Sequence, residues 1–87
     1  MTELKKNKTT VEIYNRSYTI MGEEPHSHVK LVASLVDQKM KEIQRHNGHL
    51  DIARLAVLTA VNTMSDYVKL KEDYAKLVGS ITRKKDK

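Results

Sequence analysis

Four histidines are the side chains in this sequence that could ligate a metal ion: His26, His28, His46 and His49. His26 and His28 are two positions apart, so on a helix they point to different sides. The i, i+4 pairing of helical zinc sites is absent, and the chain has no Cys to supply a thiolate. No nucleophile–base arrangement, glycine-rich phosphate loop or paired active-site carboxylates can be assembled. The sequence therefore predicts no metal, no cofactor and no catalytic residue.

Arg16 is the residue whose chemistry best suits recognition of a partner. It lies in Asn15-Arg16, which we expect to form the exposed two-residue loop of a β-hairpin. A planar guanidinium at such a place suits a carboxylate. Taken alone, an arginine in a turn is most often ordinary surface.

The elements that must position Arg16 begin with a predicted hairpin over residues 9–21. Apolar and polar residues alternate on both sides of the loop, and the register pairs Ile13 with Tyr18. That register leaves Glu12 and Thr19 on one face. The other face carries the apolar side chains Val11, Ile13, Tyr18 and Ile20.

Two helices are predicted after the hairpin. The first begins at Pro25, covers the apolar face of the hairpin and ends at Asn47-Gly48, where Gly supplies a left-handed cap. The second begins after Asp51, a natural N-cap, and continues for about 30 residues, far longer than an average helix.

The apolar residues of the second helix predict self-association. A broad face over residues 55–68 changes into a narrow seam at three- and four-residue spacing, which a chain this short cannot cover. The alternative, a monomer whose second helix folds back on the first, accounts for residues 55–68 but not for 70–81. The predicted self-association residues are Leu58, Val61, Met64, Val68, Leu70, Tyr74, Leu77 and Ile81.

Composition narrows the class of protein. The 87-residue chain has no Cys and no apolar run of about 20 residues, so we expect a cytoplasmic protein without a membrane span. Its net charge of +5 lies in the two ends, because residues 9–82 carry no net charge.

The main alternative function is DNA binding by a dimeric protein of the strand-helix-helix type. Its exposed strand face would need cations, whereas this chain offers Glu12, Tyr14, Ser17 and Thr19.

These elements predict an α+β fold in which a β-hairpin packs on a helix and a long C-terminal helix forms a dimerisation and coiled-coil interface. The expected organisation is a basic flexible tail at 1–8, a head at 9–48, the long helix at 49–82 and a basic tail at 83–87.

Three stretches of sequence carry a recognisable pattern: VEIYNRSYTIMGEE, DQKMKEIQRHNGHLD and ARLAVLTAVNTMSDYVKLKED. Together they resemble the ZapA family of bacterial cell-division proteins over roughly residues 9–78. The most specific matches are the strand-turn-strand segment around Arg16, the GEE after it and the RLAVLTAVN at the start of the long helix. The family usually has Gly before the turn arginine, where this chain has Asn15.

The resemblance implies a non-enzymatic protein that binds FtsZ, the tubulin-like GTPase of the division ring, and bundles its filaments at midcell. It implies a homodimer formed through the long helix, which in this family can pair into an antiparallel tetramer. The turn arginine, Arg16 here, is among the family's charged FtsZ-binding residues. The resemblance implies the same role for Arg54. Leu58, Val61 and Asn62 match the family's helix motif as packing and interface positions.

Overall fold

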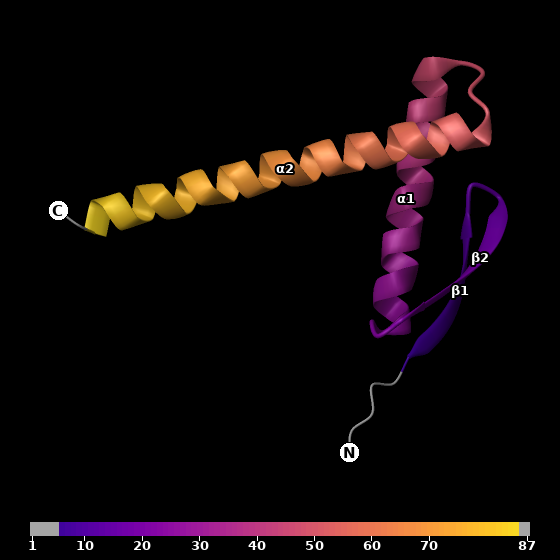
Figure 1. Cartoon of the computed structure of the whole chain (residues 1–87), viewed down its shortest axis with the longest axis horizontal. Coiled ribbons are helices and arrows are strands. Elements are labelled where there is room, and N and C mark those ends of the chain that lie inside the picture. Colours follow the sequence, from indigo (N-terminus) through magenta and orange to yellow (C-terminus); the bar gives the residue numbers. More distant parts are fainter. Residues whose placement is uncertain (1–5, 86–87) are drawn as a thin grey trace.

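The computed structural model describes the backbone of residues 6–85 and the side chains of residues 6–80. Its elements are strand β1 (Asn7–Ile13), strand β2 (Arg16–Gly22), helix α1 (His26–Asn47) and helix α2 (Ile52–Lys85). The strands form an antiparallel hairpin beside α1, while α2 crosses α1 and extends away from both (Figure 1). The molecule is flat, with principal dimensions of 55, 49 and 16 Å. The predicted α+β architecture is confirmed.

The hairpin forms, but the predicted loop is wrong by one residue. The loop is Tyr14–Asn15, and Ile13 pairs with Arg16, so Arg16 is the first residue of β2 and not part of the loop. Tyr14 and Asn15 have φ angles of 49° and 65°, as a primed two-residue turn requires. The correction moves every strand pairing by two residues. Because side chains alternate with a period of two, the predicted apolar face keeps its members.

Only half of that apolar face is covered by α1. On β1, Thr9 and Val11 are buried, with 2% and 7% of their surface exposed. On β2, Tyr18 and Ile20 remain 44% and 37% exposed. Helix α1 therefore packs on β1 and leaves the β2 half of the face open, contrary to the expectation that this helix covers the whole face.

Helix α1 ends where the sequence predicts but begins one residue later, because Pro25 is its N-cap and not its first residue. Gly48 follows the helix with a φ of 69° and a ψ of −123°, so it does not form the predicted left-handed cap, although Gly adopts this positive φ without a Cβ clash. The start of the helix is tied to β1 by a 2.6 Å hydrogen bond between the Thr9 hydroxyl and Nδ1 of His26. This contact gives one of the four histidines a structural role.

Helix α2 is a single rod of 34 residues, or about 51 Å. Its N-terminus is capped as predicted, because the Asp51 carboxylate accepts a 2.8 Å hydrogen bond from the Arg54 N–H. Leu55 is fully buried near the start of α2, and Thr59 is buried one turn later. The structure extends beyond the predicted elements at both ends, since β1 begins at Asn7 and α2 ends at Lys85.

Leu55 should be the most sensitive core position. We expect Leu55→Ala to lower the free energy of unfolding by about 2–4 kcal/mol, because it removes buried methyl groups and leaves a cavity. Leu31→Ala is the matched control, since Leu31 is 59% exposed, and it should cost less than about 1 kcal/mol. Urea unfolding at one fixed protein concentration measures both. Equal losses would contradict the packing described.

Candidate functional site

The exposed end of the hairpin carries Arg16. Its side chain is exposed, and within residues 6–80 the structure records no hydrogen bond or ion pair for it. Arg16 follows the tight loop directly and lies opposite Ile13. A guanidinium held there presents its planar set of N–H donors to any carboxylate that approaches the hairpin tip.

The loop beside Arg16 is fixed from α1. The Tyr14 N–H donates a 2.7 Å hydrogen bond to Oδ1 of Asp37, and the Lys41 ammonium pairs with Oδ2 of the same carboxylate at 3.0 Å. A positive φ costs a residue with a Cβ roughly 1–2 kcal/mol, and Tyr14 is such a residue. The Asp37 contact thus holds a loop conformation that is locally unfavourable.

These contacts also change the acidity of Asp37. The Tyr14 N–H, and after it the Lys41 ammonium, hold the pKa of the Asp37 carboxyl below its ordinary value of 3.8. Asp37 is therefore ionised throughout the neutral range.

Arg54, the second predicted partner-binding residue, lies in the first turn of α2. Its backbone N–H donates the capping hydrogen bond to the Asp51 carboxylate, and the residue is exposed to solvent. The hairpin loop and the beginning of α2 lie toward the same end of the head in Figure 1. The hairpin loop and the first turn of α2 thus lie away from the projecting end of α2.

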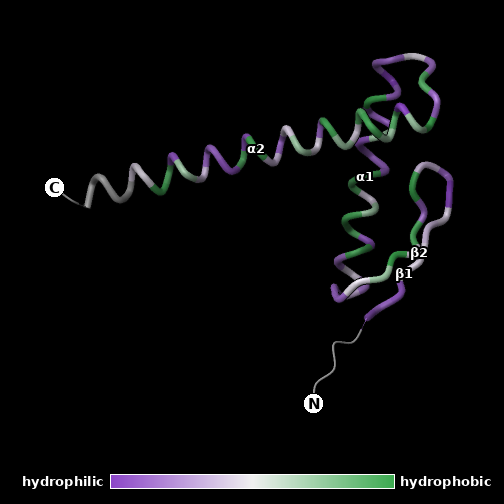
Figure 2. The backbone as a smooth tube through the Cα atoms, viewed as in Figure 1, coloured by the Kyte–Doolittle hydropathy of each residue, from purple (hydrophilic) through white to green (hydrophobic). Residues whose placement is uncertain are grey.

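The predicted self-association residues of α2 are uncovered in the single chain. The exposed fraction ranges from 39% for Leu58 to 67% for Leu70 and Tyr74. Apolar positions recur along α2 well beyond its crossing with α1 (Figure 2). The side chain of Ile81 lies outside the described residues. The others, all exposed, are Leu58, Val61, Met64, Val68, Leu70, Tyr74 and Leu77.

Two apolar stripes, rather than one, run along α2. We call the first the proximal stripe: Val57, Val61, Met64 and Val68, at spacings of four, three and four. We call the second the distal stripe: Tyr67, Leu70, Tyr74 and Leu77, at spacings of three, four and three. Adjacent residues on a helix are 100° apart, so the stripes, which meet at residues 67 and 68, face different directions.

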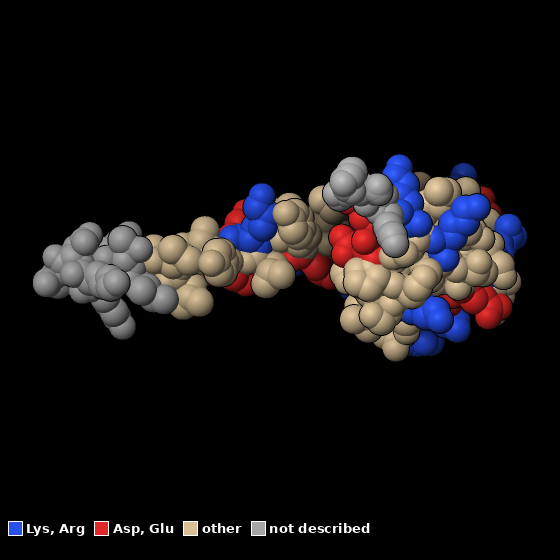
Figure 3. All heavy atoms as spheres, turned by 90° about the horizontal axis from the view of Figure 1, so that it is seen from below, with Lys and Arg blue, Asp and Glu red and all other residues tan. Residues whose placement is uncertain are grey.

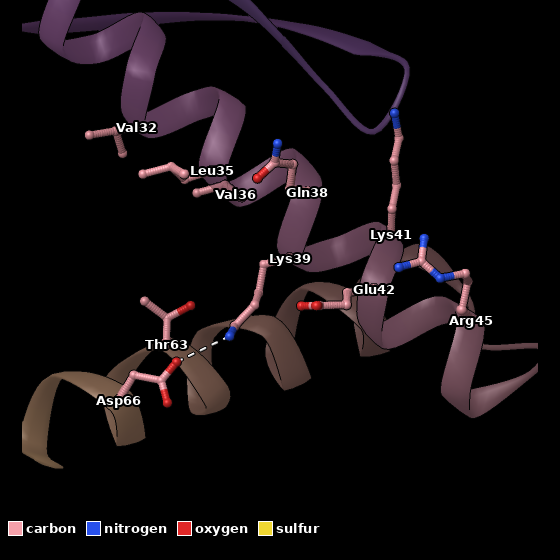
Figure 4. A pocket seen from close by; sticks show the side chains of 10 residues that line it. All are labelled: Val32, Leu35, Val36, Gln38, Lys39, Lys41, Glu42, Arg45, Thr63 and Asp66. Atoms are coloured by element: carbon pink, nitrogen blue, oxygen red, sulfur yellow. Dashed lines mark hydrogen bonds and ion pairs between the residues drawn. The ribbon is translucent and has the colours of Figure 1, made fainter.

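Sequence reasoning missed the part of this apolar surface that comes from the head. Val32 and Leu35 of α1 line an open groove between α1 and α2, which the 3.1 Å ion pair between Lys39 and Asp66 bridges (Figure 4). Val32 is 43% and Leu35 54% exposed. The signal was present in the sequence, because Leu35 widens the apolar stripe of α1 beyond what one neighbour can cover.

The described residues offer little for other chemistries. Within residues 6–80, no group of three or more His, Asp or Glu side chains is placed to hold a metal ion. No helix in the described part of the chain is long and apolar enough to cross a membrane. On the face seen in Figure 3, acidic and basic side chains both occur over the head, which is unlike the single basic surface of a nucleic-acid reader.

Comparison with known proteins identifies the family. The sequence model described as "Cell division protein ZapA" matches residues 9–87. The chain belongs to the ZapA family. Cell division protein ZapA of Oceanobacillus iheyensis is 63% identical over 99% of this chain and 100% of its own length. Cell division protein ZapA of a Geobacillus species is 52% identical over 99% of each chain.

Solved structures agree with this assignment. A ZapA mutant dimer from Geobacillus stearothermophilus has a TM-score of 0.73 and 46% identity, and the match covers 94% of this chain and 95% of that one. An unknown conserved bacterial protein from Pseudomonas aeruginosa PAO1 has a TM-score of 0.72 and 27% identity, over 90% and 87% of the chains. The ZapA family is one of cell division proteins, and a mutant ZapA protein of the same fold is a dimer.

The lowered pKa of Asp37 predicts how the stability of the chain depends on pH. Its stabilising contribution is complete above the ordinary pKa of 3.8 and is lost as the pH falls through the lowered folded-state pKa. We expect the free energy of unfolding of the wild type to exceed that of Asp37→Asn by a constant amount near neutrality. This difference should shrink below about pH 4.

Urea titrations of both proteins at a series of pH values provide the measurement. The amide introduced by Asp37→Asn retains an oxygen that can accept the Tyr14 N–H, so the comparison isolates the effect of the charge. A difference between the two proteins that stays the same down to about pH 2 would contradict the assignment of the charge effect to Asp37.

Proposed function

We propose that this chain binds FtsZ and cross-links its filaments as an oligomer at the midcell division site in the cytoplasm. Membership of the ZapA family supports a role in cell division. The observation that carries the proposal is the placement of Arg16: an exposed cation follows a rigidly held loop at the tip of the head. The proposed activity is binding, without catalysis or a cofactor.

The filament contact is proposed to centre on Arg16, with Arg54 at its edge. Each arginine offers a charge-assisted hydrogen bond to a carboxylate of the filament. A single contact of this kind is weak when solvent-exposed, so one head alone would bind and release quickly. Useful affinity then depends on how many heads one assembly carries.

A dimer is proposed to form through the proximal stripe, defined above by Val57, Val61, Met64 and Val68. These side chains are 47–62% exposed, and the groove with Val32 and Leu35 lies beside the same stretch of α2. Burying such a stripe against a second copy removes apolar surface from water at about 25 cal/mol per Å². That a mutant ZapA from Geobacillus stearothermophilus is a dimer supports self-association of this fold.

The distal stripe then remains for a second pairing. Because it faces a different direction, a single partner helix that covers the proximal stripe leaves Leu70, Tyr74 and Leu77 open. Antiparallel pairing of two dimers through this stripe gives a tetramer with heads at both ends. Such a rod gains avidity on a filament, because every bound head raises the local concentration of the others.

Arg16→Glu tests the filament contact. We expect co-sedimentation with GTP-assembled FtsZ to fall at least roughly tenfold in apparent affinity, because the substitution replaces attraction with repulsion. Lys8→Glu is the matched control, since Lys8 is an exposed residue at the opposite end of the hairpin and the charge change is the same. Light scattering should show an unchanged molecular mass for both variants. Equal loss of binding in both, or loss of self-association with Arg16→Glu, contradicts the proposal.

Leu70→Glu combined with Leu77→Glu tests the distal stripe. We expect the tetramer to dissociate to dimers, because buried carboxylates would lack partners in the seam. Lys69→Ala with Lys76→Ala changes the net charge equally at neighbouring exposed positions and should leave the mass unaltered. Light scattering and analytical ultracentrifugation give the masses. An unchanged mass in the leucine double variant rules out this interface.

A further inference from the structure

The structure shows one register of the hairpin, but its hydrophobic pattern is compatible with a second. In the observed register the loop is Tyr14–Asn15 and Val11 pairs with Tyr18. Moving the loop to Asn15–Arg16 pairs Val11 with Ile20 and leaves the same side chains on the face toward α1. Neither loop contains Gly, so neither is strongly favoured by its own turn residues.

The two registers present Arg16 differently. In the observed register Arg16 is a strand residue, held opposite Ile13 by the hairpin ladder. In the alternative register it would be the second loop residue, required to take a positive φ that a residue with a Cβ disfavours. A binding contact built on Arg16 is therefore sensitive to the register.

A contact from α1 exists only in the observed register. Tyr14 is there the first loop residue, whose N–H has no partner on the opposite strand, and Oδ1 of Asp37 accepts it at 2.7 Å. In the alternative register Tyr14 would close the ladder opposite Ser17, and its N–H would bond to β2 instead. Asp37 is held in place by Lys41 and by its position in the middle of a helix.

We propose that Asp37 is a positioning residue that selects the hairpin register by accepting the Tyr14 N–H, and so sets the presentation of Arg16 to its partner. This inference rests on the proposed function for Arg16, although the register selection stands independently of any partner. A second observation fits the observed register: the hydroxyls of Thr10 and Thr19, directly opposite each other, lie 3.2 Å apart.

Nuclear magnetic resonance distinguishes the registers without any partner. Close Hα–Hα contacts mark the non-hydrogen-bonded pairs of an antiparallel ladder. The observed register gives them for Glu12–Ser17 and Thr10–Thr19, and the alternative gives them for Ile13–Tyr18 and Val11–Ile20. The wild type should show the first set. Asp37→Ala should weaken the first set and introduce the second or lose both.

Binding to GTP-assembled FtsZ is measured on the same proteins. Asp37→Ala should weaken the apparent affinity by roughly fivefold or more, because only the fraction of molecules in the competent register binds. Asp37→Asn, which keeps an acceptor oxygen, should lose less. Glu72→Ala is the control, since it removes an exposed helix carboxylate that belongs to neither stripe of α2 and does not touch the loop.

A rescue variant separates positioning from direct contact. Tyr14→Asn with Asn15→Gly builds an Asn-Gly loop, the sequence most favourable for a primed turn at those two positions. Introduced into Asp37→Ala, it should restore both the first set of contacts and the affinity. If affinity falls while the register is unchanged, or stays low after the register is restored, Asp37 acts in another way and the proposal fails.

The remaining outcomes are equally decisive. An unchanged register in Asp37→Ala overturns the selection, and a changed register with full affinity overturns the link to Arg16. If the wild type itself does not bind FtsZ filaments, the proposed function fails, whereas the register measurement still tests Asp37. Circular dichroism of each variant checks that α1 and α2 are intact.

Discussion

Within the described residues, four hydrophobic side chains are buried: Val11, Ala33, Met40 and Leu55. So small a core cannot offset the conformational entropy lost on ordering two strands and two helices. The organisation of the molecule follows from this shortage. Within residues 6–80, apolar surface is left open on β2, on α1 and along α2, because no other described element covers it. The proposed association with further copies would cover this surface, and stability would then depend on protein concentration.

Local signals in the sequence were sufficient for the elements of the fold. Pro25, Gly48 and Asp51 act within one helical turn of themselves, so their effects are readable without tertiary information. The alternation in the hairpin identified the correct face for the same reason. The loop could not be placed, because a shift of two residues preserves that face. The contact that distinguishes the registers joins Tyr14 and Asp37, 23 positions apart, and no local pattern reports it.

For the candidate site, too, the sequence predicted residue types and exposure but not every position. The type and exposure of Arg16 followed from its place near a turn, whereas its position on β2 required the register. The residues of α2 were found from their spacing, and their exposure agrees with an uncovered surface. The crossing of α1 and α2 depends on packing between helices, so the contribution of Val32 and Leu35 needed the structure.

The length of α2 has a geometric consequence. Each residue of an α-helix advances the chain by 1.5 Å and turns it by 100°, so distance and direction along the rod cannot be varied separately. Adding one residue between the head and the distal stripe would move that stripe by only about 1.5 Å but would rotate it by about 100° relative to the head. Adding seven would nearly restore its direction while lengthening the rod by about 10 Å. In the proposed tetramer, the spacing between two heads joined through this helix could therefore change only in steps of about seven residues.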